Sequence, residues 1–386
     1  MAVTVIHSVR LVDDGTETPD AWVRFDRGFV AASGIGDEWR SRPADHVVDG
    51  GALAGEGAVL SPGFVDIHGH GGDGREYDQG AEAVRSARTA HRRHGTTRAV
   101  ISLVTADLDT LAARAAMVAD LAATDGDVLG SHLEGPFLDP GHKGAHDAAR
   151  LLAPTPQSVD RLLEAGRGTI RQITIAPELP GALDAIRQIV DRGTAVAIGH
   201  TGADAATSAA AFDAGARILT HAFNAMPPLH HRAPGPIGAA TADPRVTLEV
   251  IADGVHLDAE LVRIAFAAAS GRIALVTDAM AAAGAADGRY ELGGLAVEVR
   301  EGVARLAESG AIAGSTLTQD AALRFAVQRA GVALPTAIAA LTSTPARAVG
   351  VADRFGALTV GHVADAVLLD ASLTVRRVWA DGAAID

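Results

Sequence analysis

The stretch Val128-Leu-Gly-Ser-His-Leu-Glu-Gly-Pro-Phe137 is an apolar, strand-like run that ends abruptly at a carboxylate. Gly135 and Pro136 stop the strand directly after Glu134, because glycine lacks a Cβ and proline has a fixed φ and no amide proton. Glu134 is therefore expected at a strand end, beside the core and within reach of solvent. A single glutamate in such a place is equally consistent with a structural role. The other strands of the chain, and how they end, decide between these interpretations.

The middle of the chain contains eight β-type runs, separated mostly by alanine-rich helical stretches. The runs are 63–67, 97–101, 128–133, 171–176, 195–198, 217–220, 246–251 and 273–277. Eight strands that alternate with helices predict an α/β fold in which a parallel sheet closes into a (β/α)8 TIM barrel. A doubly wound open sheet is the alternative, but it would not explain why so many strands end in the same chemistry.

Both ends of the chain have a different rhythm, with short alternating or apolar runs between turn signals. These runs are 3–6, 21–25, 28–31, 364–369 and 375–379. All three tryptophans, Trp22, Trp39 and Trp379, lie in the two terminal segments. We therefore expect residues 1–57 and 355–386 to form one small β domain, and residues 58–354 to form the catalytic barrel.

The composition limits the classes of partner. A formal net charge of −14 over 386 residues argues against nucleic acid or an anionic membrane. The chain has no cysteine, so any metal must be held by His, Asp or Glu. No signal-peptide pattern and no apolar run of about 18 residues stands out, so we expect a cytoplasmic enzyme. An anionic small substrate would need a local basic pocket.

The expected strand ends share metal-binding and acid–base chemistry. These ends carry His68, His70, Glu134, His200, His221, Asp253, His256 and Asp278. In a barrel they converge on the C-terminal face, where active sites of this fold are built. His68 and His70, two residues apart on extended backbone, project to the same side and can hold one ion. Glu134, His200 and His221 supply a second set of ligands, and these nitrogen and oxygen donors suit zinc or iron.

Any one of these histidines is more simply explained as a hydrogen-bonded core residue. Several of them at strand ends, together with a carboxylate, favour a metal site. Asp278 is the candidate general base, since a carboxylate beside a metal-activated water can accept its proton and return it to a departing amine. The alternative for Asp278 is a purely ligating or supporting role, and the two roles are compatible.

The sequence resembles the N-acetylglucosamine-6-phosphate deacetylases of the amidohydrolase superfamily. The resemblance spans the barrel, in order and at family-like spacing, and depends on six motifs. These are His132-Leu-Glu-Gly-Pro-Phe137, Lys143-Gly-Ala-His146, Gly199-His-Thr201, Thr220-His-Ala-Phe-Asn-Ala-Met-Pro227, Asp253-Gly-Val-His256 and Thr277-Asp-Ala-Met280. Gly-His-Thr alone would be unspecific, whereas the combination is highly specific. The resemblance also implies that the terminal domain is a β-sandwich.

The resemblance implies a role for each matched residue. It implies Glu134, His200 and His221 as ligands of a catalytic divalent ion, with Asp278 as acid/base. Some family members lack the His-x-His pair and hold one ion; this chain keeps His68 and His70, so one or two ions, zinc or iron, are expected. The implied substrate-binding residues are Ala145, His146, Asn224, Ala225, Arg232, Asp253, His256, Ile312, Ala313 and Gly314.

Within that set, His146 is implied near the sugar hydroxyls, and Arg232 and His256 at the phosphate. In the family this arginine comes from the neighbouring subunit, which implies a homodimer in which Arg232 reaches the other active site. The segment Ile312-Ala-Gly314 matches one that closes over the sugar. From the sequence alone, however, Arg232 in the proline-rich loop 227–236 is equally consistent with a solvated side chain.

Three functions follow, from different classes. The first is deacetylation of N-acetyl-D-glucosamine 6-phosphate, with the galactosamine 6-phosphate epimer as a close variant. The second is another amidohydrolase activity, on a cyclic amide or as a deaminase; many such enzymes use a carboxylated lysine at a strand end, and the only lysine here, Lys143, lies in a glycine-flanked loop. The third is a non-catalytic sugar-phosphate binder, which would have no need of Asp278.

Overall fold

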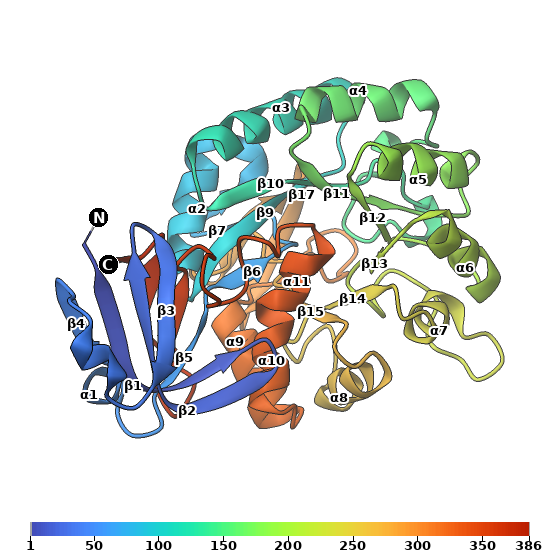
Figure 1. Ribbon diagram of the computed structural model, residues 1–386. Coiled ribbons are helices and arrows are strands. Elements are labelled where there is room, and N and C mark those ends of the chain that lie inside the picture. The colour runs from blue at the N-terminus through green and yellow to red at the C-terminus, as the bar shows by residue number, and fades with distance from the viewer. Residues whose placement is uncertain (1, 386) are drawn as a thin grey trace.

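The eight runs in the middle of the chain form one parallel sheet in the computed structural model, which describes residues 2–385 (Figure 1). Its strands are β6 (Phe64–Asp66), β9 (Thr96–Val104), β10 (Val128–Glu134), β11 (Ile170–Ile175), β12 (Ala195–Ile198), β13 (Ile218–Leu219), β14 (Thr247–Val250) and β15 (Ile273–Leu275). Every neighbouring pair is parallel, and the spatial order follows the chain order from β6 to β15. A doubly wound sheet would reverse direction at a switch point. The barrel prediction is therefore confirmed.

The first and last strands of this sheet meet without a regular ladder. Side-chain and loop contacts bridge the seam instead: the Thr277 hydroxyl donates to Asp66 Oδ2 at 2.6 Å, and the Asp278 amide donates to the His68 carbonyl at 2.8 Å. Burial raises the pKa of Asp66 to about 6, against the hydrogen bond from Thr277. The seam thus closes directly beside the strand ends that carry the candidate site.

Helices cover the outside of the sheet (Figure 1). They are α2 (Ala81–Arg93), α3 (Leu108–Thr124), α4 (Pro156–Gly166), α5 (Ala182–Asp191), α6 (Ala205–Ala214), α7 (Gly235–Ala242), α8 (Ala259–Ala268), α9 (Gln319–Arg324), α10 (Leu334–Leu341) and α11 (Ser343–Ala348). Several begin where a polar side chain accepts a hydrogen bond from a first-turn amide: Asp107 for α3, Asp204 for α6 and Asp258 for α8. These caps fix where each strand-to-helix loop ends.

Both ends of the chain build a second sheet. Its strands are β1 (Thr4–Asp13), β2 (Thr16–Asp26), β3 (Phe29–Ile35), β4 (His46–Asp49), β5 (Val59–Pro62), β19 (Ala366–Leu369), β20 (Val375–Ala380) and β21 (Ala383–Ile385). A short helix, α1 (Gly50–Ala54), links β4 to β5. The antiparallel pairing of β19 with β5 joins the two termini, and Trp22 and Trp379 are buried in this domain. The exact boundaries at residues 57 and 355 stay a prediction.

Arg98 of β9 ties the barrel to the terminal sheet. Its guanidinium is buried, forms a two-pronged pair with Asp365 at 2.5 and 2.8 Å, and donates to Asp381 at 2.8 Å. Arg98 also donates to the Gly126 carbonyl. Planar guanidinium groups suit this geometry, because two parallel N–H donors match the two oxygens of a carboxylate.

We expect Asp381→Ala to lower the free energy of unfolding by about 1 kcal/mol, because a hydrogen bond to a charged group is lost while Asp365 still pairs with Arg98. Urea denaturation measures the change. Asp37→Ala is the control, because Asp37 pairs with Arg40 between two exposed side chains and such pairs contribute little. Equal effects of the two substitutions would contradict a specific tie between the domains.

Two small sheets lie outside both large ones. β7 (Gly71–Gly72) pairs with β8 (Arg75–Glu76), and β16 (Gly288–Leu292), β17 (Leu295–Arg300) and β18 (Val303–Leu306) form an antiparallel meander. The meander has its own apolar cluster, which includes Met280 and Ala313. None of the predicted strands corresponds to this sheet, although the sheet contributes Leu292 to the wall of the main cavity.

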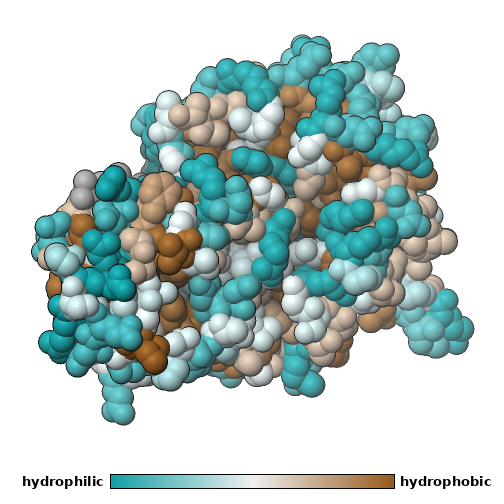
Figure 2. All heavy atoms as spheres, viewed as in Figure 1, coloured by the Kyte–Doolittle hydropathy of each residue, from teal (hydrophilic) through white to brown (hydrophobic). Residues whose placement is uncertain are grey.

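The visible face of the molecule is mostly polar, with apolar residues in small groups (Figure 2). Among residues 2–385, no helix combines the length and the apolar character needed to cross a bilayer. Exposed apolar residues such as Ile35 and Val360 are scattered over different elements. Scattered residues of this kind are normal on protein surfaces.

Candidate functional site

The candidate site is built from residues at or just beyond the carboxyl ends of the barrel strands. Glu134 is the last residue of β10, while His200, His221 and Asp278 follow β12, β13 and β15. The backbone φ is +48° at His200, +25° at His221 and +47° at Asp278. Residues other than glycine rarely adopt positive φ, because the Cβ then crowds the backbone. Backbone strain of this kind is concentrated at functional sites. The chain therefore turns sharply at three strand ends, and these turns accompany the convergence of the side chains.

Glu134, His200 and His221 bring three donor atoms together. Glu134 Oε1 lies 3.1 Å from His200 Nε2 and 3.3 Å from His221 Nε2, and the two nitrogens are 3.0 Å apart. Ligands bound at about 2.0–2.2 Å in a tetrahedral arrangement are separated by about 3.4 Å. The three atoms are thus close enough to share one ion, and imidazole with carboxylate is a donor set that suits zinc or iron.

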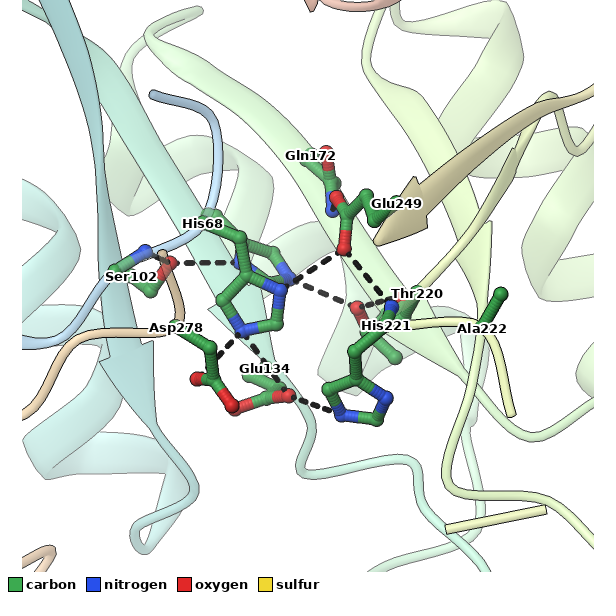
Figure 3. Close-up of polar contacts among 12 residues, drawn as sticks. His68, Ser102, Glu134, Gln172, Thr220, His221, Ala222, Glu249 and Asp278 are labelled. Carbon is green, nitrogen blue, oxygen red and sulfur yellow. Dashed lines mark hydrogen bonds and ion pairs between the residues drawn. The ribbon is translucent and has the colours of Figure 1, made fainter. Parts of the chain in front are cut away.

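His68, His70 and Asp278 form a second group beside the first. His70 Nε2 lies 3.3 Å from both His68 Nε2 and Asp278 Oδ1. The other Glu134 oxygen, Oε2, lies 3.1 Å from His70 Nε2. Glu134 Oε1 also lies 3.3 Å from His68 Nε2, so the Glu134 carboxylate stands between the two groups and is within reach of both. Figure 3 shows Glu134 and Asp278 together on one side of the His68 ring.

Hydrogen bonds on the far side of two rings leave the Nε2 atoms available as ligands. His200 Nδ1 donates to the His142 carbonyl at 2.9 Å, and His68 Nδ1 donates to Glu249 Oε2 at 2.9 Å. When Nδ1 carries the proton, Nε2 of a neutral imidazole has a free lone pair. The residues present therefore fit a divalent metal ion.

Nearby charges and hydrogen bonds shift the pKa values of two further groups, Asp278 and His256. Burial would raise the pKa of Asp278, but the charge of His68 and a hydrogen bond with His70 lower this pKa below its usual value. Burial would lower the pKa of His256, but the hydrogen bond and charge of Asp253 raise it above its usual value. Asp278 is thus an ionised carboxylate, and His256 carries its proton to higher pH than a free histidine. The Nδ1–Oδ2 distance in the His256–Asp253 pair is 2.7 Å.

A cavity of about 380 Å³ opens above these groups. Its lining includes most of the residues predicted for the site: His70, Glu134, Ala145, His146, His200, His221, Asn224, Ala225, His256, Asp278, Ile312 and Gly314. Gly314 packs against the backbone of Asp278, and a Cβ at this position would lie 3.0 Å from the Asp278 carbonyl oxygen. The segment around Ile312 therefore stands directly beside the predicted acid/base.

Four predicted residues do not line the cavity. His68 is fully buried beneath it, Ala313 is buried in the meander cluster, and Asp253 contacts His256. Arg232 is exposed on its loop, where its Nη1 lies 2.8 Å from His231 Nε2. It lines a separate depression of about 490 Å³ near α6 and α7. Within one chain, the structure does not bring Arg232 to the cavity.

Sequence reasoning missed several residues of the site. Val104, Leu292 and His142 line the cavity, and no motif marked their contribution in advance; Met226 also lines it and lies within the motif 220–227, but no role was predicted for it. Glu249 lies beneath the ligand group as a buried carboxylate. Its signal was present, because it is the only charged residue in the apolar run 246–251. Lys143, the only lysine, donates to the His146 carbonyl from a loop and lies outside the cavity lining.

Comparisons with known proteins identify the family of the chain. The sequence pattern of the amidohydrolase family matches residues 59–385. The chain belongs to the amidohydrolase family. An N-acetylgalactosamine-6-phosphate deacetylase of Escherichia coli O157:H7 is 40% identical over 328 residues, which cover 84% of this chain and 87% of the relative. An N-acetylglucosamine-6-phosphate deacetylase of Bos taurus is 35% identical, covering 94% of this chain and 90% of the relative.

A solved structure extends the similarity to the whole fold of this amidohydrolase. N-acetyl-D-glucosamine-6-phosphate deacetylase from Mycobacterium smegmatis, in complex with N-acetyl-D-glucosamine-6-phosphate, matches with a TM-score of 0.93 and 38% identity. The match covers 100% of this chain and 99% of the other. The barrel and the small β domain are therefore shared with the Mycobacterium smegmatis structure. The resemblance found in the sequence is confirmed at the level of the family.

Proposed function

We propose that this amidohydrolase removes the acetyl group from N-acetyl-D-glucosamine 6-phosphate, giving D-glucosamine 6-phosphate and acetate. The observation that carries the proposal is the position of Asp278 beside the convergent donors Glu134, His200 and His221 at the floor of one cavity. Relatives that are 33–40% identical, with names of sugar-phosphate deacetylases, supply the substrate class. A non-catalytic binder would not need an acid/base at this place.

Glu134, His200 and His221 would hold one divalent ion, and His68, His70 and Asp278 a second, with Glu134 between them. We propose zinc or iron, because both suit imidazole and carboxylate donors. A divalent ion in such a site supplies a Lewis acid that polarises a carbonyl and lowers the pKa of water. The depth of the site suits this chemistry, since Glu134, His200 and His221 are all buried.

Asp278 would move the proton. Its carboxylate accepts a proton from the water that adds to the acetyl carbonyl carbon. It then gives this proton to the nitrogen as the C–N bond breaks, so that the amine leaves neutral and acetate is released. General acid–base catalysis of this kind avoids expulsion of a strongly basic amide anion. An aspartate carboxyl is ionised at neutral pH, so the group begins as the base.

The remaining cavity residues would orient the sugar. His146 and Asn224 would contact its hydroxyl and amide groups, and the segment that includes Ile312 would cover it. His256 would meet the phosphate, since the contact with Asp253 raises the pKa of His256 and keeps its positive charge to higher pH than in a free histidine. Arg232 would reach the phosphate of the neighbouring subunit in a homodimer. We place the enzyme in the cytoplasm, where phosphorylated sugars are retained.

The galactosamine 6-phosphate epimer is a second candidate substrate, because the relative from Escherichia coli O157:H7 that is 40% identical is a deacetylase of that name. The two sugars differ only in the orientation of one hydroxyl, so the same ligands and the same acid/base would serve both. A cyclic-amide hydrolase is less well supported, because Lys143 lies in a loop rather than at a strand end, donates to the His146 carbonyl and does not line the cavity.

An acetate-release assay tests these proposals directly. We expect N-acetyl-D-glucosamine 6-phosphate to give the highest kcat/KM, its galacto epimer a lower value, and unphosphorylated N-acetylglucosamine the lowest. A higher value for the epimer would reverse the assignment of the sugar. Acetate release from none of the three would overturn the proposed function.

A further inference from the structure

Glu249 is a fully buried carboxylate on β14, beneath the donor groups of the site. Its Oε2 accepts hydrogen bonds from His68 Nδ1 at 2.9 Å and from the His221 amide at 3.2 Å. Its Oε1 accepts from Gln172 Nε2 at 2.7 Å. Figure 3 shows Glu249 on the side of the His68 ring opposite Glu134 and Asp278. One oxygen of Glu249 thus contacts both a side chain of one donor group and the backbone of the other.

The contact between Glu249 and His68 fixes the tautomer and the orientation of the His68 ring. Because Glu249 accepts the Nδ1 proton, the Nε2 atom points away from Glu249 and toward Glu134 and Asp278, at 3.3 and 3.5 Å. A carboxylate behind a ligating imidazole fixes its tautomer and its ring plane and increases its basicity. No other hydrogen bond to His68 Nδ1 is present among residues 2–385. The orientation of this ring therefore depends on Glu249.

Gln172 in turn holds Glu249. Its amide nitrogen reaches Glu249 from β11, across the inside of the barrel, and Gln172 is itself fully buried. A buried carboxylate without compensation is costly, and among residues 2–385 the only side chain in ion-pair contact with Glu249 is His68, whose ring is neutral when its Nε2 is a ligand. Burying the Glu249 carboxylate costs desolvation free energy. A metal cation bound at Nε2 of His68 would offset this cost, which explains why the carboxylate lies behind His68.

We propose that Glu249 is the positioning residue of the His68–His70–Asp278 ion site, and that this chain holds a second ion because Glu249 presents His68 to it. The inference rests on the two-ion form of the proposed function and deepens it. Glu249 touches neither the cavity nor the substrate groups. It acts through His68. Removing the Glu249 carboxylate therefore lowers the affinity for the second ion more than it changes any other property of the site.

The ion held by Glu134, His200 and His221 depends on Glu249 much less. Within residues 2–385, the bond with the His221 amide is the only link from the Glu249 side chain to that group. The Ala222 amide still donates to the backbone carbonyl of Glu249 at 2.8 Å whatever side chain position 249 carries. His200 is held separately by the His142 carbonyl. The two ion sites are therefore expected to respond differently to the same substitution.

The test measures metal stoichiometry and affinity in the full-length protein, using zinc as the probe. Metal is removed with a chelator, and zinc is titrated back in competition with a chromogenic chelator. We expect two zinc ions per wild-type subunit. Glu249→Met, which keeps the side-chain length but removes both acceptors, should weaken the second ion by about 10- to 100-fold and the first by less than about threefold.

Glu249→Gln should give an intermediate affinity. Its carbonyl can still accept from His68 Nδ1. Its amide can donate to Gln172 Oε1 once the Gln172 amide, which now presents Nε2, turns over; this Oε1 is buried and has no partner among the described residues. Asp320→Asn is the matched control, because Asp320 is a buried carboxylate that contacts His94 Nδ1 at 3.1 Å far from the cavity. This control should bind both ions as the wild type does.

The possible outcomes distinguish the proposed role of Glu249 from the proposed deacetylase function. Two ions with unchanged affinities in Glu249→Met would overturn the role of Glu249 and leave the deacetylase proposal intact. Equal weakening of both ions, with a matching fall in the thermal midpoint of the metal-free protein, would reduce Glu249 to a structural residue. A single ion in both the wild type and His68→Ala would overturn the two-ion site and this inference with it.

Discussion

Replacing Asp278 by asparagine is expected to lower kcat for acetate release by about 10²–10⁴-fold, the usual range for the loss of a general acid/base. Asparagine has the same shape but cannot take up a proton from water or deliver one to the departing nitrogen. The substitution leaves the backbone contacts of position 278 in place, including the bond from the Ser315 amide to its carbonyl at 2.7 Å. The loss is therefore expected in kcat, with little change in KM.

Metal content must be measured beside the rate, because Asp278 Oδ1 also lies within 3.5 Å of His68 and His70. A variant that keeps its Glu134–His200–His221 ion and is still slow supports the acid/base role. If the rate returns when excess zinc is added, Asp278 acts as a ligand instead. Activity close to wild type would remove Asp278 from the mechanism altogether.

The barrel could be predicted because its strands are buried on both sides. Such strands read as continuous apolar runs, and all eight runs found in the sequence fall on observed strands. The meander from β16 to β18 was missed because it packs on a small cluster of its own outside the barrel core, so its half-exposed strands carry a weaker apolar pattern. The seam contact between Asp66 and Thr277 was equally invisible, since it joins residues 211 positions apart.

The donor residues could be predicted for a different reason. A parallel barrel brings the carboxyl ends of its strands to one face, so His68, Glu134, His200 and His221 had to be near one another once the fold was known. Glu249 could not be found in this way. It lies within its strand, and only the coordinates show that its side chain points inward to His68 rather than outward to a helix.

Arg232 is the residue whose proposed role the single chain does not explain, because it is exposed and lines a depression apart from the cavity. If it binds the phosphate of the neighbouring subunit, Arg232→Ala should lower kcat/KM for the phosphorylated substrate by at least about 30-fold, since truncating one partner of a desolvated charge pair costs about 2–5 kcal/mol. Activity on the unphosphorylated sugar should hardly change. Arg245→Ala is the control: Arg245 is an exposed arginine paired with Asp243. Equal losses on both substrates would refute the phosphate contact.

A mixing experiment decides whether Arg232 acts across a dimer. Asp278→Asn subunits lack the acid/base but keep Arg232, and Arg232→Ala subunits have the reverse defect. If the arginine crosses the interface, one of the two sites in each mixed dimer has both groups, so random reassociation of equal amounts should restore about a quarter of wild-type activity. If Arg232 serves its own subunit, every mixed site lacks one group and the activity stays near that of the separate variants. The recovered fraction therefore identifies the subunit whose phosphate site Arg232 completes.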